Sequence, residues 1–211
     1  MKNLKLIISI FLTSLLANGA IANTKVWDFK VFYGESEIGQ HVFEVDKTMD
    51  KSNVTIKATF DLSIFFIPVY SYRHNNTELW KGNCLHSIKS TTDDNGESFS
   101  VSGKETGDYF AIEKNGSNEE YSGCVKTFSY WDIDILESEE LLNAQTGEVL
   151  DVEIDFVANE KKVIRNKEIN TKRYILKTDE FNIDLWYSDD DEWVALNSIT
   201  KDGGELSYVI Q

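Results

Sequence analysis

Apolar and polar residues alternate along most of the chain after residue 22. In the clearest stretch, residues 54–64, every second residue is apolar and the residues between are polar or charged. A strand collects such apolar residues on one face, whereas a helix would distribute them around its circumference. Shorter stretches at 151–157, 181–187 and 206–210 repeat the pattern. The alternation therefore predicts a chain built mainly of β-strands.

Short turn signals separate these stretches. Gly34-Glu35-Ser36, the polar run 50–53, Asn95-Gly96, Asn115-Gly116 and Gly203-Gly204 all fit hairpin connections. Asn-Gly is favoured in such turns because both residues tolerate a positive φ. From the alternation and the turns we predict strands at 25–33, 37–47, 54–64, 69–80, 84–92, 97–105, 109–114, 149–158, 162–168, 172–179 and 181–188, with a hairpin pair within 192–211.

Residues 134–143 break the alternation. Ile135, Leu136, Glu139 and Leu142 are spaced as in a short helix or helical turn, and acidic residues near its start suit the helix dipole. The remaining strands, joined by short connections, predict a single all-β domain over 23–211. We expect an antiparallel meander of about a dozen strands, curled into a barrel or half-barrel that leaves few exposed edges. Such a barrel can enclose a small ligand.

The first 22 residues have the features of an export signal. Lys2 and Lys5 precede a nearly unbroken apolar run over 6–17, and Ala20-Ile21-Ala22 supplies the small residues that a signal peptidase recognises. The apolar run is too short to span a membrane, and no longer run follows it. We therefore predict a mature chain that starts near Asn23, without a transmembrane segment, in the periplasm or secreted.

Charge and cysteine content fit that location. The whole chain has a formal net charge of −15 at pH 7, which repels nucleic-acid phosphates, so no nucleic-acid partner is expected. The charge indicates either simple solubility or a surface for a cation or a cationic partner. Cys84 and Cys124 are the two cysteines, and an even pair in an oxidising compartment predicts a disulfide; buried free thiols are the alternative.

The densest cluster of polar and aromatic residues runs from Pro68 to Trp80. If it forms one strand, Tyr70, Tyr72, His74, Asn76, Glu78 and Trp80 share a face, and inside a barrel that face would suit a polar or aromatic ligand. On an exposed sheet face, cross-strand pairing would explain the same residues. As candidate ligand-binding residues we take His41, Tyr70, Tyr72, Arg73, His74, Glu78 and Trp80.

No catalytic or cofactor motif stands out. The chain has no G-x-S-x-G, P-loop, G-x-G-x-x-G or H-E-x-x-H pattern, and its three histidines, His41, His74 and His86, are too far apart in sequence to form a close-spaced ligand pair. We expect neither a metal site nor a cofactor. An unfamiliar hydrolase or isomerase would use His41 or His74 as general base, with Glu78 or Asp61 orienting it.

Several strings taken together resemble an uncharacterised family of exported, β-rich proteins, a domain of unknown function found mainly in Gram-negative bacteria. The resemblance covers essentially the whole mature chain and implies export and a β architecture, without established catalytic residues. One departure is Ala144, where the family pattern leads us to expect proline. The strings are Gly-Gln-His-Val-Phe at 39–43, Tyr-Arg-His at 72–74 with Glu78 and Trp80, Thr-Asp-Asp-Asn-Gly at 92–96, Thr-Phe-Ser-Tyr-Trp at 127–131, Leu-Leu-Asn-Ala-Gln-Thr-Gly-Glu at 141–148, and Ile-Asp-Leu-Trp-Tyr at 183–187 with Trp193-Val194.

Three functions are compatible with these observations. The first is a non-enzymatic envelope protein that binds a small or lipidic ligand, or a partner protein, through the concave face of its barrel. The second is the hydrolase or isomerase described above. The third is a structural module whose acidic surface meets a basic partner.

Overall fold

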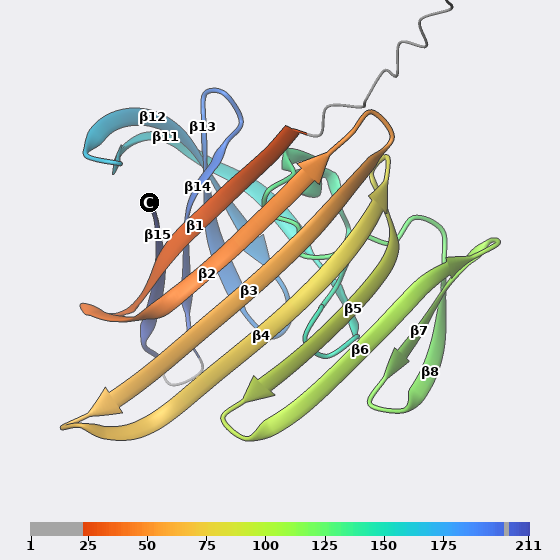
Figure 1. Ribbon diagram of the computed structural model, residues 1–211. Coiled ribbons are helices and arrows are strands. Elements are labelled where there is room, and N and C mark those ends of the chain that lie inside the picture. Colours follow the sequence, from red (N-terminus) through yellow and green to blue (C-terminus); the bar gives the residue numbers. More distant parts are fainter. Residues whose placement is uncertain (1–22, 201–202) are drawn as a thin grey trace, which may run out of the picture.

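A computed structural model describes residues 23–200 and 203–211, so the predicted export signal lies outside the described residues. These residues form one thirteen-stranded sheet and a two-stranded ribbon, with all pairs inside the sheet antiparallel (Figure 1). The predicted all-β fold is confirmed. The strands are β1 (Asn23–Tyr33), β2 (Ser36–Lys47), β3 (Lys51–Ile64), β4 (Ile67–Lys81), β5 (Cys84–Asp94), β6 (Glu97–Thr106), β7 (Tyr109–Lys114), β8 (Ser117–Ser122), β9 (Glu140–Leu142), β10 (Val149–Asp151), β11 (Glu153–Ile164), β12 (Lys167–Lys177), β13 (Asn182–Ser188), β14 (Trp193–Ile199) and β15 (Glu205–Ile210).

The two halves of the chain join at the middle of the sheet. The strand order is β11-β12-β13-β14-β15-β1-β2-β3-β4-β5-β6-β7-β8, so β1 has β15 on one side and β2 on the other. Phe29 lies opposite Ile210 in one pairing and opposite His41 in the other. The outer strands β8 and β11 do not pair with each other, and the sheet is therefore a half-barrel rather than a closed barrel.

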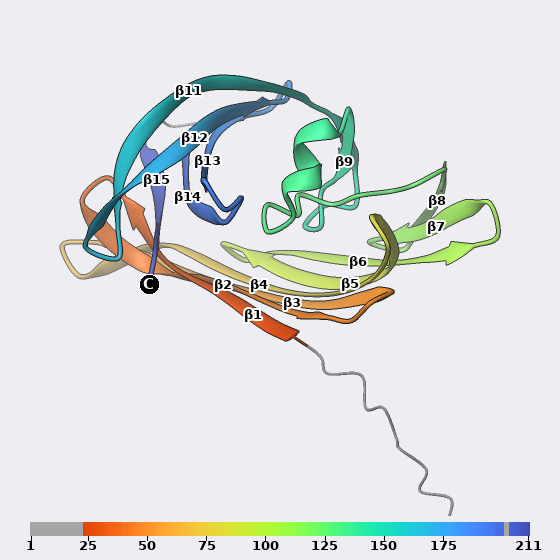
Figure 2. The same ribbon diagram turned by 90° about the horizontal axis from the view of Figure 1, so that it is seen from above.

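The sheet curls around its own core. Seen from above, β1–β8 form one wall, β11–β14 bend over it, and the segment containing β9 lies between the two (Figure 2). The core residues of both halves meet inside this curl, where Phe29 and Phe43 pack against Trp193 with ring centroids 4.3 and 5.1 Å apart. The segment between β8 and β11, residues 123–152, therefore covers an interior that the sheet leaves open, and we call it the covering segment.

The disulfide predicted between Cys84 and Cys124 is confirmed, with an S–S distance of 2.03 Å. It joins the start of β5 to the covering segment, and the backbone N–H of Leu85 donates to the Val125 carbonyl at 2.8 Å. A covalent bond and a backbone hydrogen bond thus fix the entrance of this segment to the sheet.

The helical turn expected near 134–143 is confirmed as a 3-10 helix over Ile133–Glu137, where the Asp132 carboxylate accepts from the Asp134 backbone N–H. The second part of that stretch forms β9 instead. Leu141 and Leu142 are fully buried there, because β9 pairs with β10 and brings both side chains into the core. Pairing with β10, which follows after a short loop, overrides the helical spacing of these residues.

Three strand assignments differ from the predictions. The strand expected at 149–158 is divided at Val152 between β10, which pairs with β9, and β11, which belongs to the large sheet. The strand expected at 162–168 is wrong, because Arg165 and Asn166 form a tight turn with positive φ between β11 and β12. Neither residue is glycine, so the turn lacked a clear sequence signal. Strand β8 was not predicted: Ser117–Ser122 has no apolar alternation because it is an outer strand with mostly exposed side chains.

Candidate ligand-binding cavity

Three adjacent strands bring two histidines to the same place in the interior. His41 on β2 lies opposite Ala58 on β3, and Ala58 lies opposite His74 on β4. Directly opposed residues of neighbouring strands point to the same face. The methyl group of Ala58 leaves room between the two imidazoles, which larger side chains would fill. The period-two pattern of the three strands thus converges on one site.

Glu78 is the buried carboxyl group of this site. It is 4% exposed, and its Oε1 accepts from Asn76 Nδ2 at 2.8 Å while Oε2 accepts from Trp80 Nε1 at 2.7 Å. Thr127 on the covering segment forms a further side-chain hydrogen bond with it. All of the donors on β4 come from alternate positions of one strand, so the sequence spacing alone places them around the carboxyl group.

The covering segment supplies the opposite wall. Leu142 donates its N–H to the Lys126 carbonyl at 2.8 Å, which ties the two ends of this wall together. Tyr72 donates to Gln145 Oε1 at 3.0 Å, and Gln145 Nε2 donates to Asp94 at 3.1 Å. The cavity between these walls is partly open to solvent and has a volume of about 170 Å³. Its lining is His41, Phe43, Ile56, Tyr72, His74, Asn76, Glu78, Thr127, Phe128, Tyr130, Asn143, Ala144, Gln145 and Phe181.

The ionisable groups of the cavity favour their neutral forms. Burial, together with the neighbouring His74, lowers the pKa of His41 to about 3, and burial lowers the pKa of His74 to about 4. Burial also raises the pKa of Glu78, although the hydrogen bonds from Trp80, Asn76 and Thr127 work against this. At neutral pH both histidines are therefore uncharged, and the interior disfavours charge on Glu78.

Two polar atoms of the cavity residues have no hydrogen-bond partner. They are Nε2 of His41 and Oδ1 of Asn76. The other ring nitrogen of His41 lies 3.3 Å from the Tyr208 hydroxyl, and the amide nitrogen of Asn76 is used by Glu78. Buried polar atoms are normally satisfied, because leaving one unpaired costs about 1–3 kcal/mol. Two residues of the cavity wall therefore have unused hydrogen-bonding capacity, on atoms that neighbouring protein groups almost fully cover.

The structure separates the candidate residues named from the sequence. His41, Tyr72, His74 and Glu78 line the cavity together, and Trp80 lies beneath it as a donor to Glu78. Tyr70 is at the rim, where its hydroxyl donates to Asp94 at 2.8 Å. That these residues bind a ligand stays a prediction.

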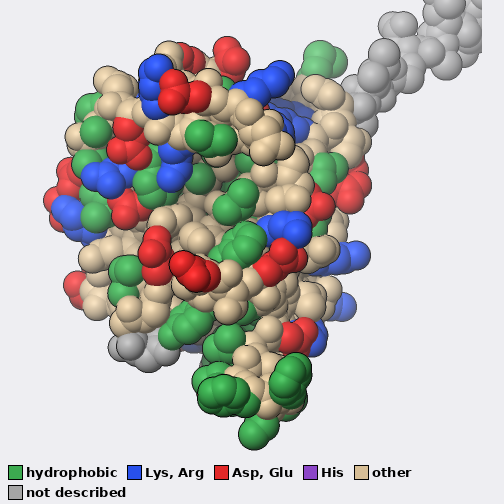
Figure 3. Space-filling model, turned by 90° about the vertical axis from the view of Figure 1, so that its left-hand side faces the viewer, with side chains coloured by type: hydrophobic (Ala, Val, Ile, Leu, Met, Phe, Trp, Pro, Cys, Tyr) green, Lys and Arg blue, Asp and Glu red, His purple; other side chains and the backbone are tan. Residues whose placement is uncertain are grey.

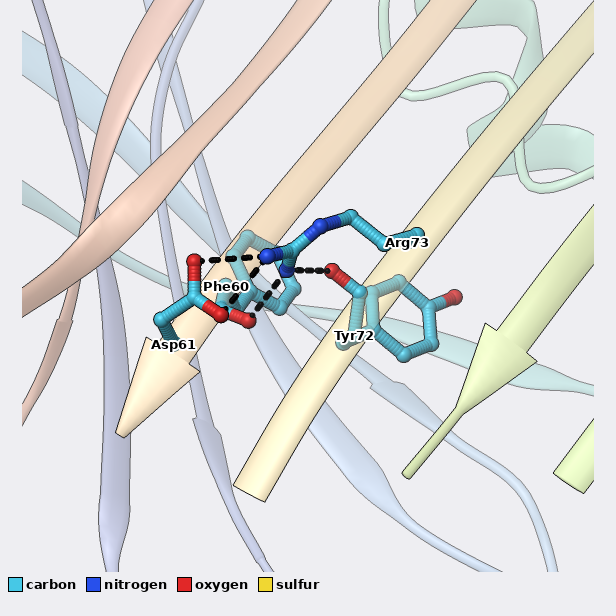
Figure 4. A network of polar contacts seen from close by, with 4 residues as sticks. All are labelled: Phe60, Asp61, Tyr72 and Arg73. Carbon is cyan, nitrogen blue, oxygen red and sulfur yellow. Dashed lines mark hydrogen bonds and ion pairs between the residues drawn. The ribbon is translucent and has the colours of Figure 1, made fainter. Parts of the chain in front are cut away.

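Arg73 points away from the cavity, since it alternates with Tyr72 and His74 along β4. Its guanidinium donates to both oxygens of Asp61, at 2.7 and 2.8 Å, and to the backbone carbonyls of Phe60 and Tyr72 (Figure 4). These bonds tie β3 to β4 on the solvent side, which gives Arg73 a structural explanation.

The cavity does not assemble the catalytic pair considered for an enzyme. His74 Nδ1 lies 2.8 Å from the Thr92 hydroxyl, and His41 Nδ1 lies 3.3 Å from the Tyr208 hydroxyl. Neither of these hydrogen-bond partners is a carboxylate. Asp61, one proposed orienting group, is on the other face of the sheet with Arg73. A base with a pKa near 3 or 4 is mostly unprotonated at pH 7 but accepts a proton weakly.

The wall opposite β4 was not predicted from the sequence. Phe128, Tyr130, Asn143 and Gln145 come from strings that carried the family resemblance, at 127–131 and 141–148, while Phe181 ends the turn that leads into β13. Their lack of periodicity concealed their position. The useful signal was that two strings without strand character were distinctive parts of the resemblance.

A larger hollow, of about 1020 Å³, lies over β3–β8 on the side of the sheet away from the core. Its outward side chains, such as Thr77, Lys89 and Glu113, are exposed to solvent. These side chains are in contact with solvent. Among the residues that line this hollow, Glu78 is the buried polar one. The smaller cavity therefore has the chemistry expected of a binding site.

Two features are absent from residues 23–200 and 203–211. No three His, Cys, Asp or Glu side chains there are grouped so as to hold a metal ion. Within the same ranges no helix has the length and apolar character needed to cross a membrane.

Comparison with known proteins identifies the family but no activity. No curated protein matches the chain. The fold is similar to that of a solved structure described as a beta-barrel-like protein of domain of unknown function DUF1849 from Brucella abortus, with a TM-score of 0.65 and 8% identity over 91% of this chain and 96% of the other. That likeness shows a shared fold. A family described as domain of unknown function DUF6134 matches residues 29–211, and the chain therefore belongs to the DUF6134 family.

Proposed function

We propose that this protein is an exported, non-enzymatic binding protein that holds a small, uncharged, hydrogen-bonding ligand in the cavity between β2–β4 and the covering segment. The observation that carries the proposal is the pair of unpartnered polar atoms, His41 Nε2 and Asn76 Oδ1, on two residues that line the same cavity. A ligand with a hydroxyl or amide N–H would donate to Asn76 and pair with the ring nitrogen of His41.

The cavity size favours a small ligand over a lipid. A volume of 170 Å³ corresponds to roughly six water molecules at about 30 Å³ each. Pockets for drug-sized ligands are commonly about 300–1,000 Å³. A ligand of only a few non-hydrogen atoms fits without rearrangement, whereas an acyl chain would require the covering segment to move.

The electrostatics favour an uncharged ligand. His41 and His74 are neutral at pH 7 because burial lowers their pKa values. Glu78 already accepts hydrogen bonds from Asn76 and Trp80, so it has little need of an external cation. A charged ligand would lose its hydration without gaining an opposite charge. The aromatic rings of Phe43, Phe128, Tyr130 and Phe181 would cover its apolar parts.

Native mass spectrometry of protein purified gently from its own source tests the proposal. We expect a bound small molecule on the wild type and its loss in Asn76→Leu, which removes the free acceptor while keeping the side-chain size. Asn75→Leu is the matched control, because Asn75 is exposed on the opposite face of the same strand. It should leave the bound molecule in place.

A second variant keeps the test independent of folding. Ala144→Leu fills the cavity from a partly exposed position in the covering segment, so it changes no hydrogen bond of Glu78. It should also abolish binding while retaining a cooperative thermal transition. Wild-type protein without any bound molecule, combined with a crystal structure in which water alone occupies the cavity, would contradict the proposal.

Export supports a role in the cell envelope. The predicted signal at 1–22 lies outside the described residues, and the disulfide is of the kind that persists in oxidising compartments. Fractionation of expressing cells, followed by N-terminal sequencing of the mature protein, tests the location. We expect a periplasmic or secreted chain that starts near Asn23.

A further inference from the structure

The hairpin formed by β3 and β4 extends well beyond its neighbours. On one side, the pairing of β2 with β3 stops at Gly39 and Phe60; on the other, the pairing of β4 with β5 stops at Tyr72 and Asp94. Residues 61–70 therefore have backbone partners only within the hairpin and form a two-stranded projection, visible at the lower left of Figure 1. We call this projection the finger.

The tip of the finger is apolar on all sides. Phe65 and Phe66 in the turn are 89% and 100% exposed, and Ile64, Ile67 and Val69 on the strands are also exposed. Figure 3, which views this end of the molecule, shows hydrophobic side chains gathered on a protrusion at its lower edge. A cluster of this kind on an otherwise polar surface marks an interaction site.

The turn itself is strained by these residues. Phe65 and Phe66 have φ values of 49° and 66°, a region that bulky residues occupy at an energetic cost. The same sheet uses Asn95-Gly96 and Asn115-Gly116 at turns with positive φ, and those residues tolerate it. Two phenylalanines therefore occupy a turn whose backbone conformation disfavours them. Both side chains are exposed, so packing within the described chain does not explain their presence.

No charged residue interrupts the finger. Residues 62–72 are all uncharged, and the charges at its base, Asp61 and Arg73, form a bidentate pair with each other. From Leu62 to Phe65 the strand advances by about 10 Å, at roughly 3.4 Å per residue. Amphipathic elements that lie at a membrane surface bury their apolar side about 5–10 Å deep. The apolar length matches that depth.

We propose that the finger inserts into the interfacial layer of a lipid bilayer. Phe65, Phe66 and the flanking isoleucines would enter the acyl region, while the pair Asp61–Arg73 would stay at the headgroups. The backbone groups that face the partner strand are paired within the finger, and the outward-facing groups would stay hydrated in the interfacial layer. This inference is independent of the cavity, which lies further along the same strands.

The geometry favours lipid over a protein groove. A groove covers one face of a strand or hairpin, whereas this finger exposes apolar side chains on both faces and at the turn. Its neutral base offers no charge that a specific partner would recognise. The net charge of −15 repels anionic headgroups, so we expect the finger to bind zwitterionic lipid through apolar contact.

Flotation with phosphatidylcholine vesicles tests the inference. Wild-type protein should float with the vesicles, equally at low and high salt. The double variant Phe65→Asn/Phe66→Gly should lower the partition coefficient by roughly tenfold or more, since burying one phenylalanine alone is worth about that factor. The same variant introduces the residues that the turn geometry favours, so its thermal transition should be unchanged or raised, which separates lost binding from lost folding.

Met49→Asn is the matched control. Met49 is 99% exposed in the turn between β2 and β3, at the other end of β3, and its replacement should leave flotation unchanged. In addition, lipids brominated near the top of the acyl chain should quench the extra fluorescence of Phe66→Trp.

Three results would overturn the inference. One is the absence of wild-type flotation, whether or not the finger mediates self-association in sedimentation experiments. Another is flotation of the double variant at the wild-type level. The third is binding that requires anionic lipid and is abolished by salt, since charge rather than the apolar tip would then be responsible.

Discussion

The two ends of strand β4 carry opposite chemistry. Its inner end, residues 72–80, is inside the sheet and places His74, Asn76 and Glu78 in the core. Its outer end, residues 67–71, extends beyond the neighbouring strands and exposes Ile67 and Val69 to solvent. The strand is therefore polar where it is buried and apolar where it is exposed.

A strand that is polar where it is buried and apolar where it is exposed is not arranged for stability alone. Burying apolar groups and hydrating polar ones would stabilise the fold, and most of this sheet follows that rule. Proteins depart from such rules mainly at functional sites. The two departures here lie on one strand, and each is associated with a separate feature: the cavity at the inner end and the finger at the outer end.

The largest effect should follow from removing the disulfide that anchors the covering segment over the inner end of β4. Cys84 and Cys124 are separated by 40 positions, and a loop of that size is worth about 4 kcal/mol of unfolding free energy in the chain-entropy estimate. Cys84→Ser/Cys124→Ser should lower the melting temperature, measured by calorimetry, by many degrees. Vesicle binding by the finger should survive at temperatures where the variant is folded. An unchanged melting temperature would contradict the anchoring role.

Removing the buried carboxyl group should have the next largest effect. Glu78→Ala leaves Trp80 Nε1 and Asn76 Nδ2 without an acceptor and creates a cavity, so we expect a loss of about 3 kcal/mol in urea denaturation. Glu78→Gln keeps an acceptor oxygen and the shape, and it should cost clearly less. Equal losses for both variants would show that packing alone determines the role of Glu78.

Acid should destabilise the inner end through its histidines. The pKa values of His41 and His74 are about 3 and 4 in the folded protein against 6.5 in the unfolded chain, so the unfolded state binds more protons below about pH 6.5. Stability should fall from there toward pH 4, by about 2–3 kcal/mol at pH 5.5 for both groups together. Glu78 acts in the opposite direction, because its raised pKa makes the folded state bind a proton more readily.

Denaturation curves at a series of pH values measure this acid effect. His74→Gln should flatten the dependence between about pH 6.5 and 4.5 by roughly half. His86→Gln is the control, since His86 lies near the surface beside Glu105. A pH dependence that is unchanged in His74→Gln would rule out this histidine as its source.

The smallest effect concerns the outer end. Phe65→Asn/Phe66→Gly should raise the unfolding free energy by about 1 kcal/mol, because asparagine and glycine adopt a positive φ at a lower cost than phenylalanine. The reverse change in the neighbouring hairpin, Asn95→Phe/Gly96→Phe, should lower it by at least as much. If the first pair of substitutions destabilised the protein, the exposed phenylalanines would have a structural role.

Most of the fold could be predicted from the sequence, because alternation along residues such as 54–64 depends only on one face being buried. The turns at Asn95-Gly96 and Asn115-Gly116 were predicted for the same local reason. Phe65-Phe66 makes an equally tight turn without the usual residues, and Arg165-Asn166 has only Asn166 and no glycine, so neither was predicted as a turn of this kind. Their conformation is imposed by the pairing of the long strands on each side.

Half of the candidate cavity could be predicted, namely the half on β4. The relation between His41 and His74 depends on β3 lying between their strands with Ala58 at the matching position, which requires the register of three strands. Gln145 and Phe128 could not be placed, because their segment follows no periodic pattern. The position of that segment is set by the Cys124 disulfide and by the hydrogen bond from the Leu85 N–H on β5 to the Val125 carbonyl.

The pairing of β1 with β15 has a consequence for biogenesis. Phe29 and Val31 gain their second neighbouring strand only when residues 206–210 are present, so the central ladder cannot be completed during synthesis of the preceding part. Contacts so distant in sequence slow folding. Until those residues have been made, the open edge of β1 is free to pair with other strands, which makes the unfinished chain prone to aggregation.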